Sequence, residues 1–299
     1  MCNKLVMPFS NVLHLNFRDK LKVMNIAEFN SMSIQPQEIK KIMAEEKIKI
    51  TDIKKIAADY GVTITRLDPL CTWVPKWETK NFGSSFNDGH STTPQEFFEI
   101  ATALEVQIMS LNATFPEGTY STEQLSEFFY TIDSMANDHG ILCGLEAIPM
   151  WGVKTIAQAW DIVNGSGSKM GGIVIDTLHF VRGNSTLEML DKIPSNRFHN
   201  IQICDGPLNL PENKTLEDEC FSRMWPGDGE FPLIEILKYL KERKVLREVC
   251  AEVFSYTNKN KSLEEIATLS REKVENLFTK AGISYSDLQS NLTIKNFNQ

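Results

Sequence analysis

The chain has 299 residues, of which 42% are hydrophobic, and it carries a net charge of −8 at neutral pH. This length suits one large α/β domain or two smaller ones, with ample material for a core. The acidic balance argues against a nucleic-acid partner, because a polyphosphate requires a basic face. The sequence contains no run of about eighteen apolar residues and no signal-peptide pattern. We therefore expect a cytoplasmic protein without a membrane partner.

Strand-like and helix-like stretches alternate along the whole chain. We expect strands at 5–7, 30–34, 62–65, 106–111, 141–145, 172–175, 199–204 and 249–253. Helices are expected from Phe17, at 37–60, from Pro94, from Ser121, at 154–163, at 186–192, from Pro232 and from Ser262 to Gly282. Several of these helices begin with a capping-box pattern such as Thr93-Pro94-Gln95-Glu96. Two long loops, 70–91 and 205–230, are typical of lids or binding loops.

Eight strands that alternate with helices predict a parallel sheet, and their number favours a single closed (β/α)8 TIM barrel over an open sheet. We assign residues 1–282 to this barrel. Residues 283–299 are expected to form a C-terminal extension that is either packed on the barrel or loosely ordered. Six cysteines are spread along the chain without a CxxC pair, so we expect reduced core residues: Cys2, Cys71, Cys143, Cys204, Cys220 and Cys250.

A polar residue ends each of four successive strands: Glu146, Asp176, Gln202 and Glu252. Side chains alternate along a strand, and in all four strands this alternation allows the polar residue to face the barrel interior at the same end. Three carboxylates and an amide oxygen are hard ligands that suit Mg²⁺ or Mn²⁺, and Co²⁺ or Zn²⁺ less well. The alternative is four unrelated polar strand ends, but three clustered acids without a cation would repel one another.

Asp176 also allows a simpler interpretation, in which it caps the turn that follows the strand GIVID. His179 lies three residues later, so it reaches the same site only if the strand turns directly after Asp176. Trp73 and Trp151 are candidates to cover a sugar-like ring, although loop tryptophans are as often core anchors. Asp68 and Asn112, which end two earlier strands, are further candidates for substrate contact. His199 begins its strand, at the end opposite the site, and is expected to be structural.

The motifs LEAIP, IDTLH, IQICDG, RMWPGDGEFPL and AEVF occur in this order along the chain. With them the sequence resembles the xylose isomerase-like barrel superfamily, which includes sugar epimerases, inosose dehydratase, 3-dehydroshikimate dehydratase and, more remotely, endonuclease IV. The resemblance implies that Glu146, Asp176, Gln202 and Glu252 bind one divalent ion. Many members have His where this chain has Gln202, and the resulting all-oxygen ligand set favours manganese, magnesium or cobalt over zinc. The acidity of the chain and its five histidines argue against endonuclease activity.

The same resemblance implies that Arg223 holds a substrate oxygen or carboxylate and that His179 binds substrate or transfers a proton. We expect a metal-dependent isomerase or epimerase of a small sugar or keto-polyol, in which Glu146 and Glu252 take and return a proton beside a metal-bound carbonyl. One alternative is a dehydratase (lyase) of a cyclic polyol ketone such as inosose or 3-dehydroshikimate, with His179 as base. Another alternative is a non-catalytic sugar-binding barrel. The sequence leaves a homo-oligomer open.

Overall fold

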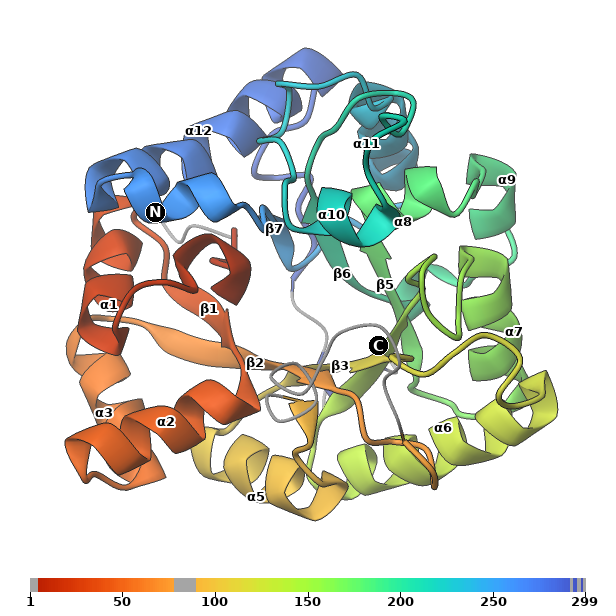
Figure 1. Ribbon diagram of the computed structural model, residues 1–299, viewed down its shortest axis with the longest axis horizontal. Helices are drawn as coiled ribbons and strands as arrows, with labels where there is room; N and C mark the ends of the chain where they lie inside the picture. The colour runs from red at the N-terminus through yellow and green to blue at the C-terminus, as the bar shows by residue number, and fades with distance from the viewer. Residues whose placement is uncertain (1–4, 78–89, 291–292, 295–296, 298–299) are drawn as a thin grey trace.

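The structure is a computed structural model that describes residues 5–77, 90–290, 293–294 and 297. Cys2 and most of the expected loop 70–91 lie outside these residues. Seven parallel strands follow one another around a ring in chain order, and helices surround them (Figure 1). The strands are β1 (Ser31–Ile34), β2 (Thr63–Leu70), β3 (Ile108–Asn112), β4 (Leu142–Glu146), β5 (Gly172–Asp176), β6 (Phe198–Ile203) and β7 (Val249–Ala251).

The expected first strand, residues 5–7, joins the two edges of this sheet. Leu5 forms a parallel bridge with Val249 beside β7, and Met7 forms one with Met32 on β1. The Val6 N–H donates to the Val249 carbonyl oxygen at 3.0 Å. The described residues therefore contain seven regular strands, and isolated bridges stand where the eighth strand was expected.

The helices fill the connections between strands, and several begin at the expected residues. Thr93, Ser121 and Ser262 each cap a helix through a complete capping box. The α-helices are α1 (Phe17–Ile26), α2 (Pro36–Glu46), α3 (Ile50–Asp59), α5 (Pro94–Leu104), α6 (Thr122–Asp138), α7 (Ile156–Gly165), α8 (Thr177–Arg182), α9 (Leu187–Leu190), α10 (Leu216–Cys220), α11 (Leu233–Glu242) and α12 (Leu263–Ala281). Short 3-10 helices are η1 (Phe9–Val12), η2 (Ser195–Arg197) and η3 (Tyr256–Asn260).

One helix prediction was wrong and another was too long. The single long helix expected at 37–60 is divided into α2 and α3, because Lys47 adopts a left-handed conformation (φ 54°) that ends α2. The short helix expected at 186–192 is present, but α9 has only four residues after its N-cap Thr186. A short helix that was not predicted, α8, instead begins directly after β5. This turn is the condition that His179 needed to approach the strand ends.

The main core lies between the strands and the surrounding helices, and a smaller apolar cluster includes part of the C-terminal segment. Phe297 is buried in that cluster with Ile108 and Leu142. Its ring meets the His199 ring edge-on, with centroids 6.3 Å apart. His199 therefore contacts core groups, as its position at the start of the strand suggested. Within the described parts of the chain, every helix is too short or too polar to cross a membrane.

Candidate active site

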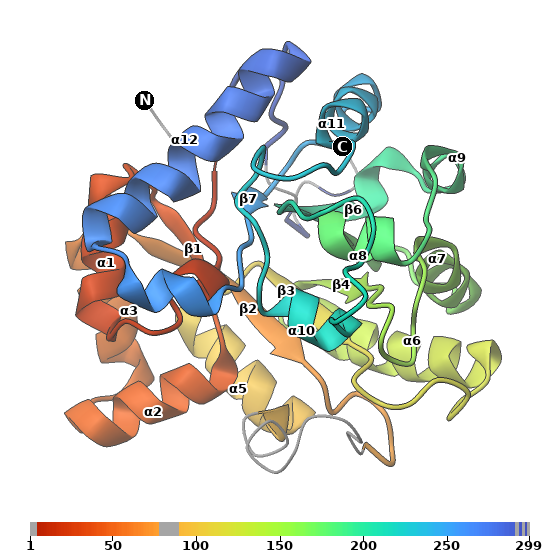
Figure 2. The same ribbon diagram turned by 45° about the horizontal axis from the view of Figure 1, so that its top comes forward.

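A cavity of about 210 Å³ lies at the carboxyl ends of the strands. Figure 2 shows α8 and α10 beside this end of the barrel. Carboxyl, amide, imidazole and guanidinium groups line part of the cavity, and aromatic and aliphatic side chains line the rest. The lining residues are Phe9, Leu13, Gln35, Gln37, Asp68, Pro69, Cys71, His90, Asn112, Glu146, Ile148, Trp151, His179, Gln202, Cys220, Phe221, Arg223, Glu252 and Phe254.

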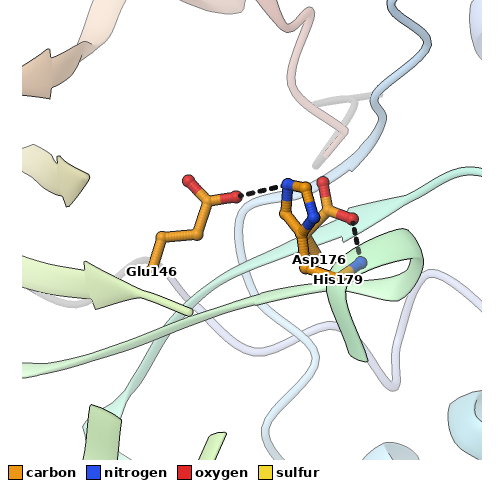
Figure 3. A group of neighbouring side chains, drawn as sticks. All are labelled: Glu146, Asp176 and His179. Carbon is orange, nitrogen blue, oxygen red and sulfur yellow. Dashed lines mark hydrogen bonds and ion pairs between the residues drawn. The ribbon is translucent and has the colours of Figure 1, made fainter. Parts of the chain in front are cut away.

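Two carboxylates and an imidazole form a buried group at the ends of β4 and β5 (Figure 3). Glu146 ends β4, Asp176 ends β5, and His179 lies in the first turn of α8. Nε2 of His179 is 3.7 Å from Oε1 of Glu146. One potential ligand atom from each residue lies within 4.8 Å of the others. The three side chains therefore have both the types of atom and the spacing to share a cation.

Asp176 has a structural task in addition to its place in this group. Its Oδ1 accepts hydrogen bonds from the backbone N–H groups of Leu178 (2.8 Å) and His179 (3.2 Å), which makes Asp176 the N-cap of α8. Its Oδ2 accepts a hydrogen bond from Arg223 at 2.6 Å. The capping interpretation and the site interpretation therefore both describe this residue, one for each carboxylate oxygen.

Arg223 supplies a positive charge inside the acidic cluster. Its Nη1 donates to Asp176 and, at 3.2 Å, to Oε2 of Glu252. Its Nη2 lies 3.3 Å from Nε2 of His179. The guanidinium group is buried and also lies over the ring of Phe254, 5.2 Å from its centroid, within the distance of about 6 Å at which a cation is attracted to a ring face. The sequence indicated Arg223 as a substrate contact but did not indicate these pairings.

Gln202 and Glu252 complete the polar floor of the cavity. Nε2 of Gln202 donates to Oε1 of Glu252 at 2.8 Å. Oε1 of Gln202 is buried and has no hydrogen-bond partner among the described residues. An unsatisfied buried acceptor costs free energy. A cation at this position would satisfy it.

Burial sets the protonation of these groups. It raises the pKa of Glu146 well above the usual value, and the charge of Asp176 adds to the increase. Burial raises the pKa of Glu252 in the same way, although Arg223 opposes it. Burial alone would raise the pKa of Asp176, but the Arg223 guanidinium holds it at about 2. Burial lowers the pKa of His179 to about 4, so its imidazole is neutral at pH 7.

The residues present fit a hard divalent cation. One guanidinium faces three buried carboxyl groups, so further positive charge or bound protons are needed to balance the cluster. The unsatisfied Gln202 oxygen and the carboxylate oxygens of Glu146, Asp176 and Glu252 are the donor types that Mg²⁺ and Mn²⁺ prefer. An ion held by all four residues would compete with Arg223 for carboxylate oxygens.

The predicted substrate-contact residues divide into two groups. Asp68, Asn112, Trp151 and Arg223 line the cavity. Trp73 does not line it: its indole N–H donates to the Asn112 carbonyl oxygen at 3.0 Å, and its ring lies beside that of Phe115 in the core. We therefore correct Trp73 to a core anchor. Asp68 accepts a hydrogen bond from Ser110.

The aromatic wall of the cavity was missed by sequence reasoning. Phe9 and Phe254 meet edge-on with ring centroids 5.4 Å apart, and Phe221 lies 5.9 Å from Phe254. Phe254 belongs to the motif AEVF and was within reach of sequence analysis. Phe9 lies in a short 3-10 helix near the N-terminus, and no sequence pattern connected it with the other strand ends. Gln35 and Gln37, at the start of α2, were missed as well.

Comparison with known proteins places this architecture in a family. Residues 25–273 match the family model described as xylose isomerase-like TIM barrel. The chain is 30% identical to an inosose isomerase of Bacillus velezensis over 165 residues, which are 54% of this chain and 55% of that protein. It is 22% identical to a 3-dehydroshikimate dehydratase of Pseudomonas putida over 191 residues, 62% of this chain and 28% of that protein. The chain spans about half the length of the inosose isomerases that it matches.

Solved structures show the same fold. The IOLI protein, solved with a binding zinc atom, superposes with a TM-score of 0.78 at 20% identity and covers 93% of this chain and 99% of its own. D-psicose 3-epimerase, solved in the presence of D-fructose, has a TM-score of 0.66 at 14% identity over 94% of this chain and 100% of its own. With these architectures and the match over most of its length, the chain belongs to the xylose isomerase-like TIM barrel family.

Proposed function

We propose that this protein is a divalent-metal-dependent isomerase or epimerase of a small, uncharged sugar or cyclic keto-polyol. The observation that carries the proposal is that Glu146, Gln202 and Glu252 line one cavity, while Asp176 lies buried beside Glu146 and is joined to Glu252 through Arg223. Two of its carboxyl groups have a raised pKa, which is the property of residues that exchange a proton with substrate near neutral pH. The likeness to inosose isomerases supports the same class.

The charges and the size of the cavity support a small neutral substrate. Among its described lining residues there is one arginine and no lysine, and Arg223 already contacts Asp176 and Glu252. A carboxylate or phosphate group would therefore find no unpaired arginine or lysine side chain there. The volume of about 210 Å³ corresponds to roughly seven water molecules at about 30 Å³ each. That is room for a single ring, below the range of about 300–1,000 Å³ that is typical of larger ligand sites.

The proposed chemistry assigns a task to each polar residue. When bound, a divalent ion polarises a carbonyl oxygen and acidifies the neighbouring C–H. Glu252 takes that proton, and Glu146 returns a proton to the other face of the carbon. The neutral imidazole of His179 orients a hydroxyl group, and Arg223 holds the carboxylates of Asp176 and Glu252 in place. The aromatic wall of Phe9, Phe221 and Phe254 excludes water, which strengthens these polar contacts.

The second candidate function is dehydration of a neutral cyclic ketone such as inosose. His179 favours it, because a neutral buried imidazole in reach of Glu146 has the protonation state of a base. The matched 3-dehydroshikimate dehydratases support a lyase as well. Their named substrate carries a carboxylate, however, and the cavity described here offers that group no unpaired cation. We therefore favour a neutral ring in either reaction.

Incubation of the Mn²⁺-loaded protein in D₂O with inosose, and separately with D-fructose, tests the proposal. An isomerase incorporates deuterium beside the carbonyl group and retains the oxygen atoms, whereas a dehydratase releases one water. Mass spectrometry and NMR distinguish the two outcomes. Glu252→Gln should abolish exchange, and the matched control Glu235→Gln, on the exposed face of α11, should not. Lack of deuterium exchange with both ketones in metal-loaded protein would contradict the proposal.

A further inference from the structure

Arg182, the last residue of α8, makes a dense set of contacts away from the cavity. Its Nε and Nη2 donate to the two carboxylate oxygens of Glu219 at 2.6 and 2.5 Å. The same guanidinium donates to the backbone carbonyl oxygens of Pro207 (2.6 Å) and Leu208 (2.9 Å). It lies over the Phe231 ring, 5.1 Å from the centroid. The side chains of Arg182 and Glu219 are only 8% and 4% exposed, so water screens the pair little.

Glu219 connects this pair to the guanidinium in the cavity. It lies in α10, directly before Cys220. The carbonyl oxygen of Cys220 accepts a hydrogen bond from Nε of Arg223 at 3.2 Å. Nη2 of Arg223 also lies 3.6 Å from the sulfur of Cys220. The position of α10 therefore determines where the Arg223 guanidinium lies.

Arg182 connects the pair to the other side of the cluster. It follows His179 by three residues on α8, and α8 begins at its cap, Asp176. Asp176 in turn accepts from Arg223, and Nη2 of Arg223 lies 3.3 Å from His179. Asp176 is thus linked through α8 to Arg182, which binds Glu219, and α10 links Glu219 to Arg223. Arg223 in turn binds Asp176, so the contacts form a ring. Neither Arg182 nor Glu219 is among the residues that line the cavity.

We propose that Arg182 and Glu219 are positioning residues that fix His179 relative to Arg223 by clamping α8 to α10. The kinetic part of this inference rests on the proposed function, because it treats His179 as a group that meets the substrate. The structural part does not. A bidentate guanidinium–carboxylate pair fixes both distance and orientation, which a contact between apolar side chains would not do. Displacement of a catalytic group by about 1 Å can cost roughly 100-fold in rate.

The variants Arg182→Met and Glu219→Gln open the clamp without enlarging either side chain. Each should lower kcat by about 10- to 100-fold and change KM by less than about threefold, because the cavity lining is intact while the reacting groups are misplaced. Arg197→Met is the matched control. Arg197 also donates to two backbone carbonyl oxygens, those of Ser168 and Gly171, and lies over the ring of Phe297. The Arg197→Met variant should keep kcat within about twofold of the unmodified protein.

A double-mutant cycle separates positioning from general loss of structure. In a His179→Asn background there is no imidazole to place, so Arg182→Met should cost less than about threefold more in kcat. If the full factor persists in that background, Arg182 does not act through His179, and the proposal is overturned. Arg197→Met should be additive with His179→Asn.

A readout on metal-free protein makes the test independent of activity. Histidine labelled with ¹⁵N reports each imidazole by NMR, and hydrogen exchange reports the amides of α8. Opening the clamp should shift or broaden the His179 ring signals and speed exchange in α8, while the His199 ring signals stay unchanged. Unchanged His179 signals and exchange would overturn the clamp even in an active enzyme. If the expected NMR changes occur but the wild-type protein turns over none of the tested ketones, the clamp is supported and only the proposed function is contradicted. Glu219→Gln, which preserves shape, decides the result if Arg182→Met fails to fold.

Discussion

Nη1 of Arg223 lies 2.6 Å from Oδ2 of Asp176, although 47 residues separate the two in the chain. The other oxygen of the same carboxylate caps α8. The Asp176 side chain thus connects the end of β5, the start of α8 and the buried guanidinium of Arg223. A change at Asp176 should therefore affect both stability and metal binding.

Asp176→Asn should destabilise the protein by about 3–5 kcal/mol, because it leaves the Arg223 guanidinium buried with a weaker partner. The variant should also lose bound divalent ion, since it removes one carboxylate ligand. Urea unfolding and elemental analysis measure the two effects. Asp191→Asn is the control, because the Asp191–Arg243 pair is largely exposed on the aspartate side and should contribute at most about 1 kcal/mol. A loss of less than about 1 kcal/mol in Asp176→Asn would contradict the expectation.

Gln202→His should change which ion the protein prefers. An imidazole nitrogen is a softer donor than an amide oxygen and suits zinc better than magnesium or manganese. We expect the ratio of zinc affinity to manganese affinity to rise by at least about tenfold, as measured by competition with a chelator. Gln202→Asn, which keeps the donor type on a shorter side chain, should weaken both ions without raising that ratio. An unchanged ratio in Gln202→His would indicate that residue 202 does not bind the ion.

His179→Asn should distinguish the two candidate reactions. If His179 only orients a hydroxyl group, the loss of one hydrogen bond should lower kcat/KM by roughly 10- to 100-fold. If His179 is the base of a dehydratase, the loss should reach about 10²- to 10⁴-fold or more. The variant should still bind the ion in both cases, because Glu146, Asp176, Gln202 and Glu252 still offer four oxygen donors, and elemental analysis of the variant checks that any loss of rate is not a loss of metal. A change of less than about threefold would show that His179 does not meet the substrate.

His199 should make stability depend on pH. Burial, helped by Arg197 and Arg247, lowers the pKa of His199 from 6.5 to about 3. Between these values the unfolded chain binds a proton that the folded protein does not, so stability falls as the pH falls below about 6.5. Between pH 7 and pH 5 the native protein should lose about 2 kcal/mol more than His199→Gln. Chemical denaturation at the two pH values measures the free energy of unfolding. If the native protein and His199→Gln lose the same amount between pH 7 and pH 5, the lowered pKa of His199 is contradicted.

The positions of the acids could be predicted because strand periodicity is simple. Side chains on a strand alternate with a period of two, and parallel neighbours end at the same edge, so Glu146 and Asp176 meet once the strands are assigned. Asp176 pairs with Gln202 only after a register shift between Ile173 and Val174, which strand periodicity does not predict. Local signals such as the box at Ser121 also located the starts of helices.

Other features depend on contacts that no local pattern reports. The pairing of Arg223 with Asp176 and Glu252 depends on how a long loop folds back over the barrel. The turn into α8 needs a carboxylate that caps while it also serves the cluster, and the sequence left these as alternatives. The break at Lys47 depends on one residue in a left-handed conformation, which lysine seldom adopts. Trp73 was interpreted as a binding residue because its burial depends on tertiary contacts with Asn112 and Phe115, which the local sequence does not report.

The bridging segment at residues 5–7 has a consequence for folding during synthesis. Val6 bonds to Val249, and the side chain of Asn11 donates to the Ala251 carbonyl oxygen at 2.8 Å and accepts from the Val253 N–H at 2.8 Å. These partners are made about 240 residues later, and non-local pairings of this kind slow folding. During synthesis, the segment at residues 5–7 stays without its neighbour β7 and offers unpaired backbone groups to other chains. Aggregation during expression should therefore depend more on the time before β7 emerges than on the stability of the finished barrel.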